Sequence, residues 1–297
     1  MSAPHVFDRA LLRHRRRRAR ALGAATFLID RTAADLAERL STVLRRFARA
    51  ADLGSPTDAV RRAVGGLVDT LIAVDAAPED VRAHAGPRVV ADEEALPFAD
   101  ASLDLVVSAL ALQSVNDLPG TLVQVRRVLK PDGYFVAALL GGESLGELRQ
   151  SFAAAEAEVE GGVSPRVAPF VEVRDAGALL QRAGFALPVA DVDRVTVRYA
   201  SAFALMADLR RMGATNPLVE RRRTPLRRAT LMRMTETYAA RFSDPDGRVR
   251  ASFDIIWLSG WAPHPAQPQP LKPGSAQVRL ADALGTREIP AGEKPER

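Results

Sequence analysis

The sequence predicts an α/β protein with a doubly wound, mostly parallel sheet of seven strands and a helical insertion before the last strand. Short apolar runs alternate with segments of helical periodicity between residues 50 and 140, which is the pattern of parallel βαβ units. Two of the runs, 103–109 and 134–140, are almost continuously apolar, as in strands that helices cover on both faces. Ligands of such sheets bind at the carboxyl ends of the strands.

The first part of the chain supplies four of the expected strands. Leu36, Leu40 and Val43 recur at helical spacing after Asp30, a candidate N-cap. The patterns predict helices over 28–49, 58–66 and 78–85, and strands over 50–53, 67–75, 89–91 and 103–109.

The remaining elements follow the same logic. The patterns predict helices over 119–129, 143–160, 173–183, 203–213 and 225–242, a turn over 130–133, and strands over 134–140, 189–199 and 253–261. Residues 189–199 alternate like an exposed strand. We divide the chain into an N-terminal helical segment (1–45), a core (46–200), a helical insertion (201–250), the last core strand (251–262) and a proline-rich tail (263–297). Five prolines between 263 and 274 predict extended chain there.

Composition excludes several classes of chemistry. The chain has no cysteine, so disulfides, thiolate zinc sites, cysteine nucleophiles and iron–sulfur clusters are ruled out. The four histidines do not form a facial triad with carboxylates at a strand end, and we expect no metal site. No apolar run approaches the roughly 20 residues that span a bilayer.

Arginine dominates the basic residues and gathers in two clusters, His14–Arg20 and Arg221–Arg228. Neither cluster is interleaved with the aromatic residues that single-strand binders use. The clusters therefore favour a solvated helix surface, or one that faces an acidic partner, over nucleic-acid binding. Residues 1–25 loosely fit an organellar transit peptide. Val6–Leu12 is typical of a docking segment, however, so we expect a retained N-terminus and a cytoplasmic protein, with an organellar matrix as the alternative.

Acidic residues follow three neighbouring strands of the predicted sheet. They are Asp52, Asp75 and Asp92. A carboxylate after the second strand can accept hydrogen bonds from both ribose hydroxyls of a nucleoside cofactor, and one after the third can reach the adenine amine. Glycine is favoured in the first turn, where the backbone approaches the cofactor closely. This spacing predicts a nucleoside site at the carboxyl edge.

Several motifs resemble class I S-adenosylmethionine (SAM)-dependent methyltransferases. They are Glu94-Ala95-Leu96-Pro97-Phe98, Leu103-Asp104-Leu105-Val106-Val107-Ser108 and Val128-Leu129-Lys130-Pro131-Asp132-Gly133. Further segments resemble one branch, the methyltransferase-like complex I assembly factors. These are residues 116–120, 141–149, 161–166 and 211–216, and Gly260-Trp261. The likeness covers about Val6 to Leu284. The malonyl-carrier methyltransferases share the central motifs but not the later ones.

The resemblance implies a Rossmann-like methyltransferase sheet that binds SAM. It places the cofactor on Asp52, Gly54, Asp75, Ala76, Asp92, Glu93, Ser108 and Ala109. The branch also implies a protein substrate, an arginine of a respiratory complex I subunit, and hydroxylation as the reaction of its mitochondrial members. Asn116 and Asp117 follow the fourth strand and are candidate catalytic residues, with capping of the next helix as the equally weighted alternative.

The chain departs from the family in its first glycine-rich motif. The usual Asp-x-Gly-x-Gly-x-Gly is replaced by the residues from Asp52 to Asp58, with Pro56 and Asp58 at the second and third glycines. Pro56 has no N–H to donate, and losing one such donor costs roughly 1–3 kcal/mol. The usual His-Trp after the fourth strand is Gln113-Ser114.

Three functional interpretations remain open. The first is a SAM-dependent enzyme that modifies a protein. The second is a non-catalytic assembly protein on a degenerate methyltransferase fold, which the altered glycine motif favours. The third is a small-molecule methyltransferase of the malonyl-carrier type. Methylation of nucleic acid is the weakest alternative, and it would predict steeply salt-dependent binding.

Overall fold

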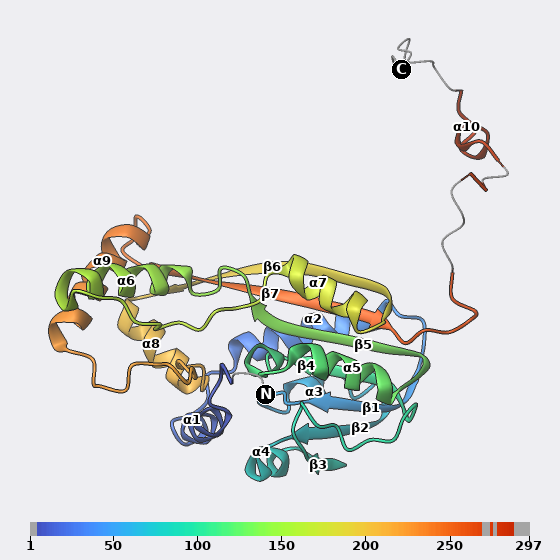
Figure 1. Ribbon diagram of the computed structural model, residues 1–297, viewed down its shortest axis with the longest axis horizontal. Helices are drawn as coiled ribbons and strands as arrows, with labels where there is room; N and C mark the ends of the chain where they lie inside the picture. Colours follow the sequence, from blue (N-terminus) through green and yellow to red (C-terminus); the bar gives the residue numbers. More distant parts are fainter. Residues whose placement is uncertain (1–4, 269–273, 276–277, 288–297) are drawn as a thin grey trace. The chain divides into compact units, whose positions relative to one another are not determined.

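Seven strands form one sheet in the computed structural model, which describes residues 5–268, 274–275 and 278–287 (Figure 1). In spatial order they are β3 (Arg88–Val90), β2 (Val68–Asp75), β1 (Phe47–Leu53), β4 (Leu103–Ala109), β5 (Leu129–Gly141), β7 (Val249–Trp261) and β6 (Ala186–Tyr199). The strands from β3 to β5 pair in parallel, and β7 runs antiparallel to both of its neighbours. The predicted fold class is confirmed.

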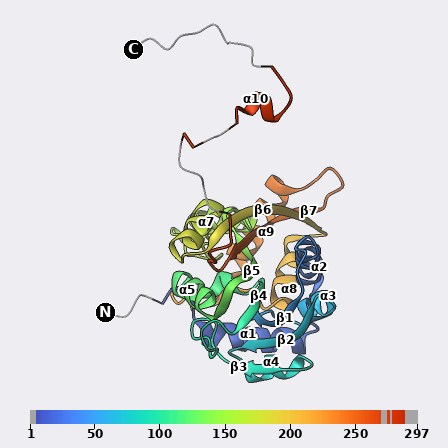
Figure 2. The same ribbon diagram turned by 90° about the vertical axis from the view of Figure 1, so that its right-hand side faces the viewer.

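Helices cover both faces of the sheet. On one face lie α2 (Phe27–Ser41) and α3 (Ala59–Val64), and on the other α5 (Leu118–Val128) and α7 (Val173–Arg182) (Figure 2). Each face has its own buried apolar cluster, as a doubly wound sheet requires. The other helices are α1 (Arg9–Ala21), α4 (Pro78–Ala83), α6 (Gly146–Glu160), α8 (Ala202–Arg211), α9 (Arg228–Phe242) and α10 (Leu280–Ala283), with a 3₁₀ turn, η1 (Leu112–Ser114).

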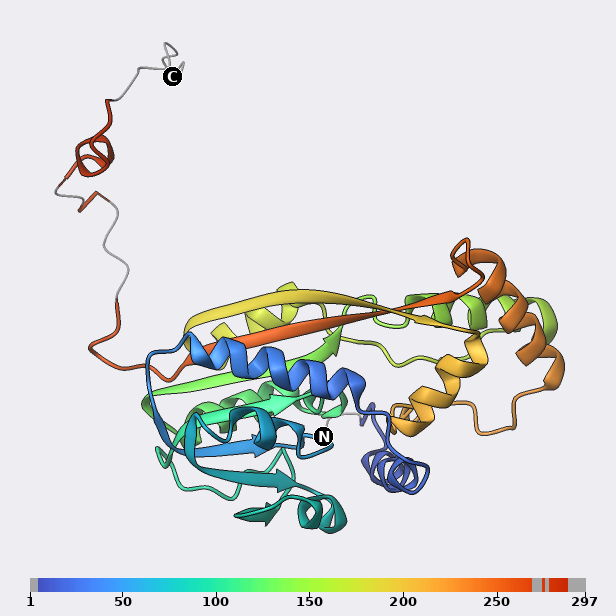
Figure 3. The ribbon, with the colours of Figure 1, turned by 180° about the vertical axis from the view of Figure 1, so that it is seen from behind.

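The helical insertion follows the edge strand. Helices α8 and α9 come between β6 and β7 in the chain. Both strands extend beyond the shorter parallel strands toward α6, α8 and α9, which gather there (Figure 3). Along β6, exposed residues alternate with half-buried ones over most of its length, as its sequence predicted.

The chain divides into two units, residues 1–263 and 264–297. The second unit contains α10 within the predicted extended tail. No proline lies between Gly274 and Thr286, so nothing in that stretch prevents a short helix. Two of the five prolines used for the tail prediction, Pro270 and Pro273, lie outside the described residues.

The helix predicted over 28–49 is too long. It ends at Ser41, and Phe47 begins β1. The Ser41 and Thr42 hydroxyls donate to the carbonyls of Glu38 and Arg39, at 2.6 and 2.8 Å, and such bonds compete with continuation of a helix. Phe47 is fully buried beside Val68 of β2, so its apolar side chain belongs to the sheet.

The turn predicted over 130–133 is instead the irregular start of β5. Leu129 already pairs with Leu103 of β4, and the register then shifts before Leu105 pairs with Tyr134. Asp132 takes a left-handed φ of 62°, a conformation that aspartate tolerates better than most residues. The turn-like residues therefore produce a bulge within a strand.

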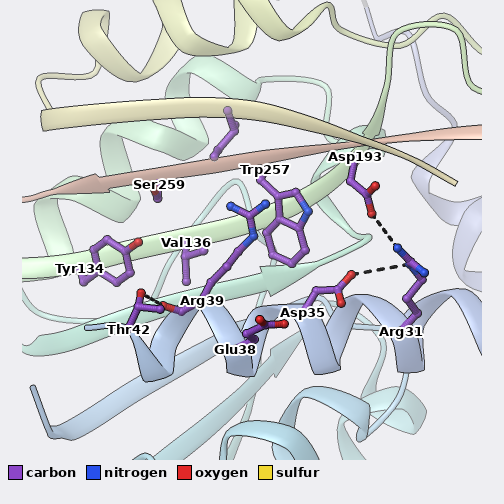
Figure 4. Close-up of a pocket in the computed structure, with 11 residues that line it drawn as sticks. Arg31, Asp35, Glu38, Arg39, Thr42, Tyr134, Val136, Asp193, Trp257 and Ser259 are labelled. Carbon is purple, nitrogen blue, oxygen red and sulfur yellow. Dashed lines mark hydrogen bonds and ion pairs between the residues drawn. The ribbon is translucent and has the colours of Figure 1, made fainter. Parts of the chain in front are cut away.

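A hollow of about 470 Å³ lies between α2 and the sheet (Figure 4). Arg39 places its guanidinium 4.3 Å from the centroid of the Trp257 ring and bonds both carboxylate oxygens of Asp191. Arg31 pairs with Asp193 at 3.1 Å. These contacts tie edge strand β6 to α2. The hollow lies beside the early residues of β5, away from the strand ends where ligands of this fold bind.

Candidate functional site

The predicted acidic residues meet at the carboxyl edge of the sheet. Asp52 pairs in register with Ala73 of β2, and Asp75, at the end of β2, pairs with Val90 of β3. Asp92 and Glu93 follow β3 after one further residue, Ala91. The parallel topology thus brings these carboxylates to one edge. We refer to the space bounded by Gly54, Asp75, Asp92 and Glu93 as the acidic cleft.

Asp52 is enclosed at the bottom of this edge. Its side chain is buried and accepts a hydrogen bond from the Ser55 hydroxyl. Burial raises the pKa of Asp52 to about 7, although Ser55 and the charge of Arg61 oppose the shift. Near neutral pH, this carboxyl group is therefore partly protonated.

The raised pKa predicts a pH-dependent stability. A carboxyl group whose pKa is about 7 in the folded protein and 3.8 as its ordinary value takes up a proton on folding between these limits. The free energy of unfolding should therefore fall as pH rises from about 4 to about 7, by up to about 4 kcal/mol. Asp52→Asn should lack this decline, which urea unfolding across the range measures. Asp69→Asn, at the exposed start of β2, is the control. If the free energy of unfolding of the wild type and of Asp52→Asn changed equally with pH, the raised pKa of Asp52 would be contradicted.

The first turn requires glycine. Gly54 has a φ of 67°, and a Cβ there would collide with the Glu93 carboxylate and lie 3.0 Å from Ala111 Cβ. Asp58, which replaces a family glycine, forms an ion pair with Arg62. Its charge is therefore compensated within α3. Pro56 still offers no N–H to a ligand.

Two arginines of α1 occupy the acidic cleft. The Arg9 guanidinium contacts three carboxylates: Asp92 and Glu94 at 3.0 Å each, and Glu93. Arg16 Nη1 lies 3.3 Å from Asp75 Oδ2 and 3.5 Å from the Gly54 carbonyl. The Arg9 and Arg16 side chains are only 15% and 13% exposed. They therefore form a largely desolvated contact between α1 and the sheet edge.

Hydrogen bonds fix the remaining carboxylate oxygens. Burial alone would raise the pKa of Glu94, but the backbone N–H groups of Asn116 and Asp117, together with Arg9, hold it below its ordinary value. Asp75 Oδ1 accepts from Ala77 N at 2.7 Å. Glu94 and Asp75 are thus each held by backbone N–H groups as well as by an arginine.

The space that α1 leaves in the acidic cleft is very small. The hollow between α1 and this edge, lined by Leu12, Arg16, Asp75 and Glu93 among others, measures only about 10 Å³. Small-molecule sites usually measure about 300–1,000 Å³. The carboxylates are suited to a nucleoside, and in this arrangement α1 occupies the space beside them.

The two candidate catalytic residues have structural partners. Asp117 caps α5 by accepting from Gly120 N at 2.7 Å. Asn116 accepts from Phe7 N at 2.8 Å and donates to the Phe7 carbonyl. These contacts hold the helix start and the N-terminal segment. A catalytic role for Asn116 or Asp117 stays a prediction.

The other predicted cofactor residues lie at different depths. Ala76 lines the small hollow beside Asp75. The Ser108 side chain is fully buried and donates to the Leu53 carbonyl at 2.7 Å, and the backbone N–H of Ala109 donates to Ser55 Oγ. Ser108 and Ala109 therefore stabilise the end of β1 and the turn that follows it through hydrogen bonds. Gln113 and Ser114 form η1 beside the site.

Sequence reasoning did not place Arg9 and Arg16 in the site. The arginine-rich start of the chain could have indicated this role, but we interpreted it as a helix surface that is solvated or faces an acidic partner. Arg17 and Arg18 are indeed exposed, whereas Arg16 faces the acidic cleft. The second cluster also has acidic partners within the chain, since Arg221 pairs with Asp8 and Arg222 with Glu160.

Within the described parts of the chain, no group of three or more histidine, aspartate or glutamate side chains is arranged to hold a metal ion. The described helices also include none long and apolar enough to cross a membrane.

Comparison with known proteins agrees with this geometry. Residues 51–137 match a family model described as a methyltransferase domain. The chain is 37% identical to "Arginine-hydroxylase NDUFAF5, mitochondrial" of Danio rerio over 94% of this chain and 89% of that protein. It is also 37% identical to the Homo sapiens protein of that name, over 98% and 87%.

More distant relatives share the fold. The chain is 37% identical to the malonyl-[acyl-carrier protein] O-methyltransferase of Halorhodospira halophila over 79% of this chain and 81% of that protein. The solved structure of the YcgJ protein from Bacillus subtilis superposes with a TM-score of 0.53 at 15% identity. The superposition covers 78% of this chain and 98% of the YcgJ chain.

Proposed function

The chain belongs to the family of the arginine-hydroxylase NDUFAF5 proteins, and on this premise we propose that it binds SAM in the acidic cleft and modifies an arginine of a protein substrate. The substrate that we propose, from the likeness to assembly factors, is a subunit of respiratory complex I. We assign the cofactor contacts from the positions of the residues at the sheet edge.

The convergence of carboxylates around the glycine turn carries this proposal. Asp75, at the end of β2, would accept hydrogen bonds from the ribose hydroxyls, and Asp92 and Glu93 would lie beside the adenine. Gly54 lets the backbone approach the cofactor without a side chain. When bound, SAM supplies a reactive methyl group, and the protein's part is to hold and orient both reactants.

Arg9 occupies the carboxylates that this proposal assigns to the cofactor. Its guanidinium is held by Asp92, Glu93 and Glu94 at the same edge. Carboxylates and guanidinium groups form strong, directional pairs. Because Asp92 and Glu93 are assigned to the adenine, Arg9 would have to leave them when the cofactor binds, and a substrate arginine would bind elsewhere along the edge.

The closed cleft favours a second candidate, a non-catalytic assembly protein. Arg16 donates to Asp75 Oδ2, an oxygen that a ribose hydroxyl would otherwise use. Pro56 has no N–H, so the glycine turn lacks one donor. A protein that used only its surface would need neither an open cleft nor that donor. The two candidates differ in whether a protein arginine changes chemically.

The structure of the N-terminal segment bears on location. Helix α1 packs against the rest of the fold and contributes Leu12 to buried surroundings beside Leu28 and Leu140. A transit peptide that is removed would take these contacts with it. We therefore propose that α1 is retained in the folded protein; the cytoplasmic location stays a prediction, and the named NDUFAF5 relatives are mitochondrial.

Mass spectrometry distinguishes the two candidates. Cells that lack the chain supply unmodified respiratory complex, which is incubated with purified chain and SAM, and in parallel also with dioxygen and a two-electron reductant, because SAM can transfer a methyl group but no oxygen atom. An arginine that gains a methylene group or an oxygen atom, only with the intact chain, is the expected result. Asp75→Ala serves as the inactive control. Absence of any chain-dependent arginine modification would refute the enzyme and leave the non-catalytic assembly protein.

A further inference from the structure

A second cavity, of about 340 Å³, lies beside the acidic cleft. Its walls come from α1, α6 and α8, from the ends of β5 and η1, and from the connection that follows α8. Its volume is within the range of small-molecule sites. It shares only Leu12 and Ser114 with the residues that line the small hollow of the acidic cleft.

Most of the lining is apolar. Its larger apolar side chains include Leu28, Leu140, Leu148, Phe152, Met206 and Phe253. Leu148 and Phe152 belong to α6, and Phe253 belongs to β7. An apolar chain or ring that entered this space would lose its contact with water on several sides.

The charged part of the lining has a single sign. Five arginines line the cavity, Arg15, Arg166, Arg210, Arg221 and Arg222, and no aspartate or glutamate does. Carboxylates outside the lining compensate three of them. Arg166 pairs with Glu156, Arg221 with Asp8 and Arg222 with Glu160.

The other two arginines form no ion pair with a carboxylate in the part of the chain that the structure describes. Arg15 Nη1 donates only to the backbone carbonyls of Thr215 and Asn216. The Arg210 side chain is exposed and has no hydrogen bond or ion pair among the described residues. Burial and the nearby charge of Arg221 lower the pKa of Arg15, and the charge of Asp8 only partly opposes this shift. The cavity therefore has uncompensated positive charge beside an apolar interior, and an anionic group would be attracted to it.

We propose that this cavity binds an amphipathic anion, a small molecule with an apolar chain or ring and one carboxylate or phosphate group. Its apolar part would lie among Leu148, Phe152 and Phe253, and its anionic group would lie between Arg15 and Arg210. A guanidinium group would meet only like charges here, so the cavity is a site separate from the edge that holds Arg9. The proposal goes beyond the modification of a protein arginine and does not depend on SAM binding.

Calorimetry with four ten-carbon probes tests the charge and the apolar part separately. The probes are decanoate, decyl phosphate, decanol and decyltrimethylammonium, each below its micelle concentration. We expect decanoate or decyl phosphate to bind about tenfold more tightly than decanol, and the cation not to bind. The preference between carboxylate and phosphate identifies the anionic group.

Variants place the binding in this cavity. Arg210→Ala should weaken the anion about tenfold and leave decanol unchanged. Arg241→Ala, which removes an exposed arginine of α9 outside the lining, should change neither. Because Arg210 is exposed, its variant is expected to fold. Equal affinity for decanol and decanoate, or an anion affinity that survives Arg15→Ala/Arg210→Ala, would overturn the proposal.

A further variant separates this proposal from the cofactor proposal. Asp75→Ala should abolish SAM binding and leave decanoate binding intact. Decanoate binding without SAM binding in the wild-type chain would refute only the cofactor site. SAM binding without anion binding would refute only the cavity proposal.

Discussion

Replacing Asp75 by alanine is expected to reduce the affinity of the chain for SAM about 100-fold or more. Asp75 stands at the end of β2, where its carboxylate would accept hydrogen bonds from two ribose hydroxyls. Hydrogen bonds to a charged group contribute about 1.5–3 kcal/mol each. Two of them correspond to roughly 3–6 kcal/mol, or more than 100-fold in the dissociation constant. Isothermal titration calorimetry measures this loss.

A matched control uses the opposite end of the same strand. Asp69 lies near the start of β2 and pairs with Arg46 at 2.7 Å, so Asp69→Ala should leave SAM affinity unchanged. Because Asp75 also holds Arg16, the comparison is best repeated in an Arg16→Ala background. An Asp75→Ala variant that retained wild-type affinity in that background would refute the assignment of the ribose contact.

The second large effect concerns α1. Arg9→Ala/Arg16→Ala should bind SAM about 10- to 100-fold more tightly than the wild-type chain. The two guanidinium groups stabilise the closed arrangement, and the cofactor can bind only to the open one. The apparent dissociation constant therefore equals the intrinsic one divided by the open fraction. The ion pairs of Arg9 and Arg16 are partly buried, and we take them to stabilise the closed arrangement by about 1.4–2.8 kcal/mol in total. Removing both would therefore raise the open fraction about 10- to 100-fold.

The control for this variant comes from the same helix. Arg17 and Arg18 are exposed on α1 and contact no carboxylate of the acidic cleft, so Arg17→Ala/Arg18→Ala should leave SAM affinity near the wild-type value. Weaker SAM binding by Arg9→Ala/Arg16→Ala would show the opposite role, in which these arginines hold the cofactor.

The strand-end carboxylates could be predicted from the sequence because their placement depends only on topology. Asp52 and Asp75 end apolar runs, and Asp92 follows a short one, so a parallel sheet must bring them to one edge. The same reasoning identified Gly54, where a side chain would strike Glu93. Local sequence and one topological rule were sufficient for this half of the site.

The closure by α1 could not be predicted in this way. Arg16 meets Asp75 across 59 residues and Arg9 meets Glu93 across 84. Helical periodicity shows which face of a segment is charged, but not which distant surface it contacts. The end of α2 was missed for a related reason, since Phe47 fits the helical period yet is buried in the sheet.

The arginine-lined cavity likewise depends on distant segments. Arg15 comes from α1, Arg166 from the loop after α6, and Arg210 from α8. In the sequence, Arg15 and Arg221 belong to separate charge clusters that are typical of solvated surface. The bridge between Phe7 and Leu218 and the ion pair between Asp8 and Arg221 bring them to one cavity.

Movement of α1 on cofactor binding is the central claim, and a distance measurement tests it most directly. The chain has no cysteine, so Arg18→Cys on α1 and Val123→Cys on α5, both exposed, can carry two spin labels without other changes. Pulsed electron paramagnetic resonance should give one narrow distance distribution without SAM and a second, longer population at saturating SAM. A single unchanged distribution, in a sample whose calorimetry shows SAM bound, would contradict a cleft that α1 closes.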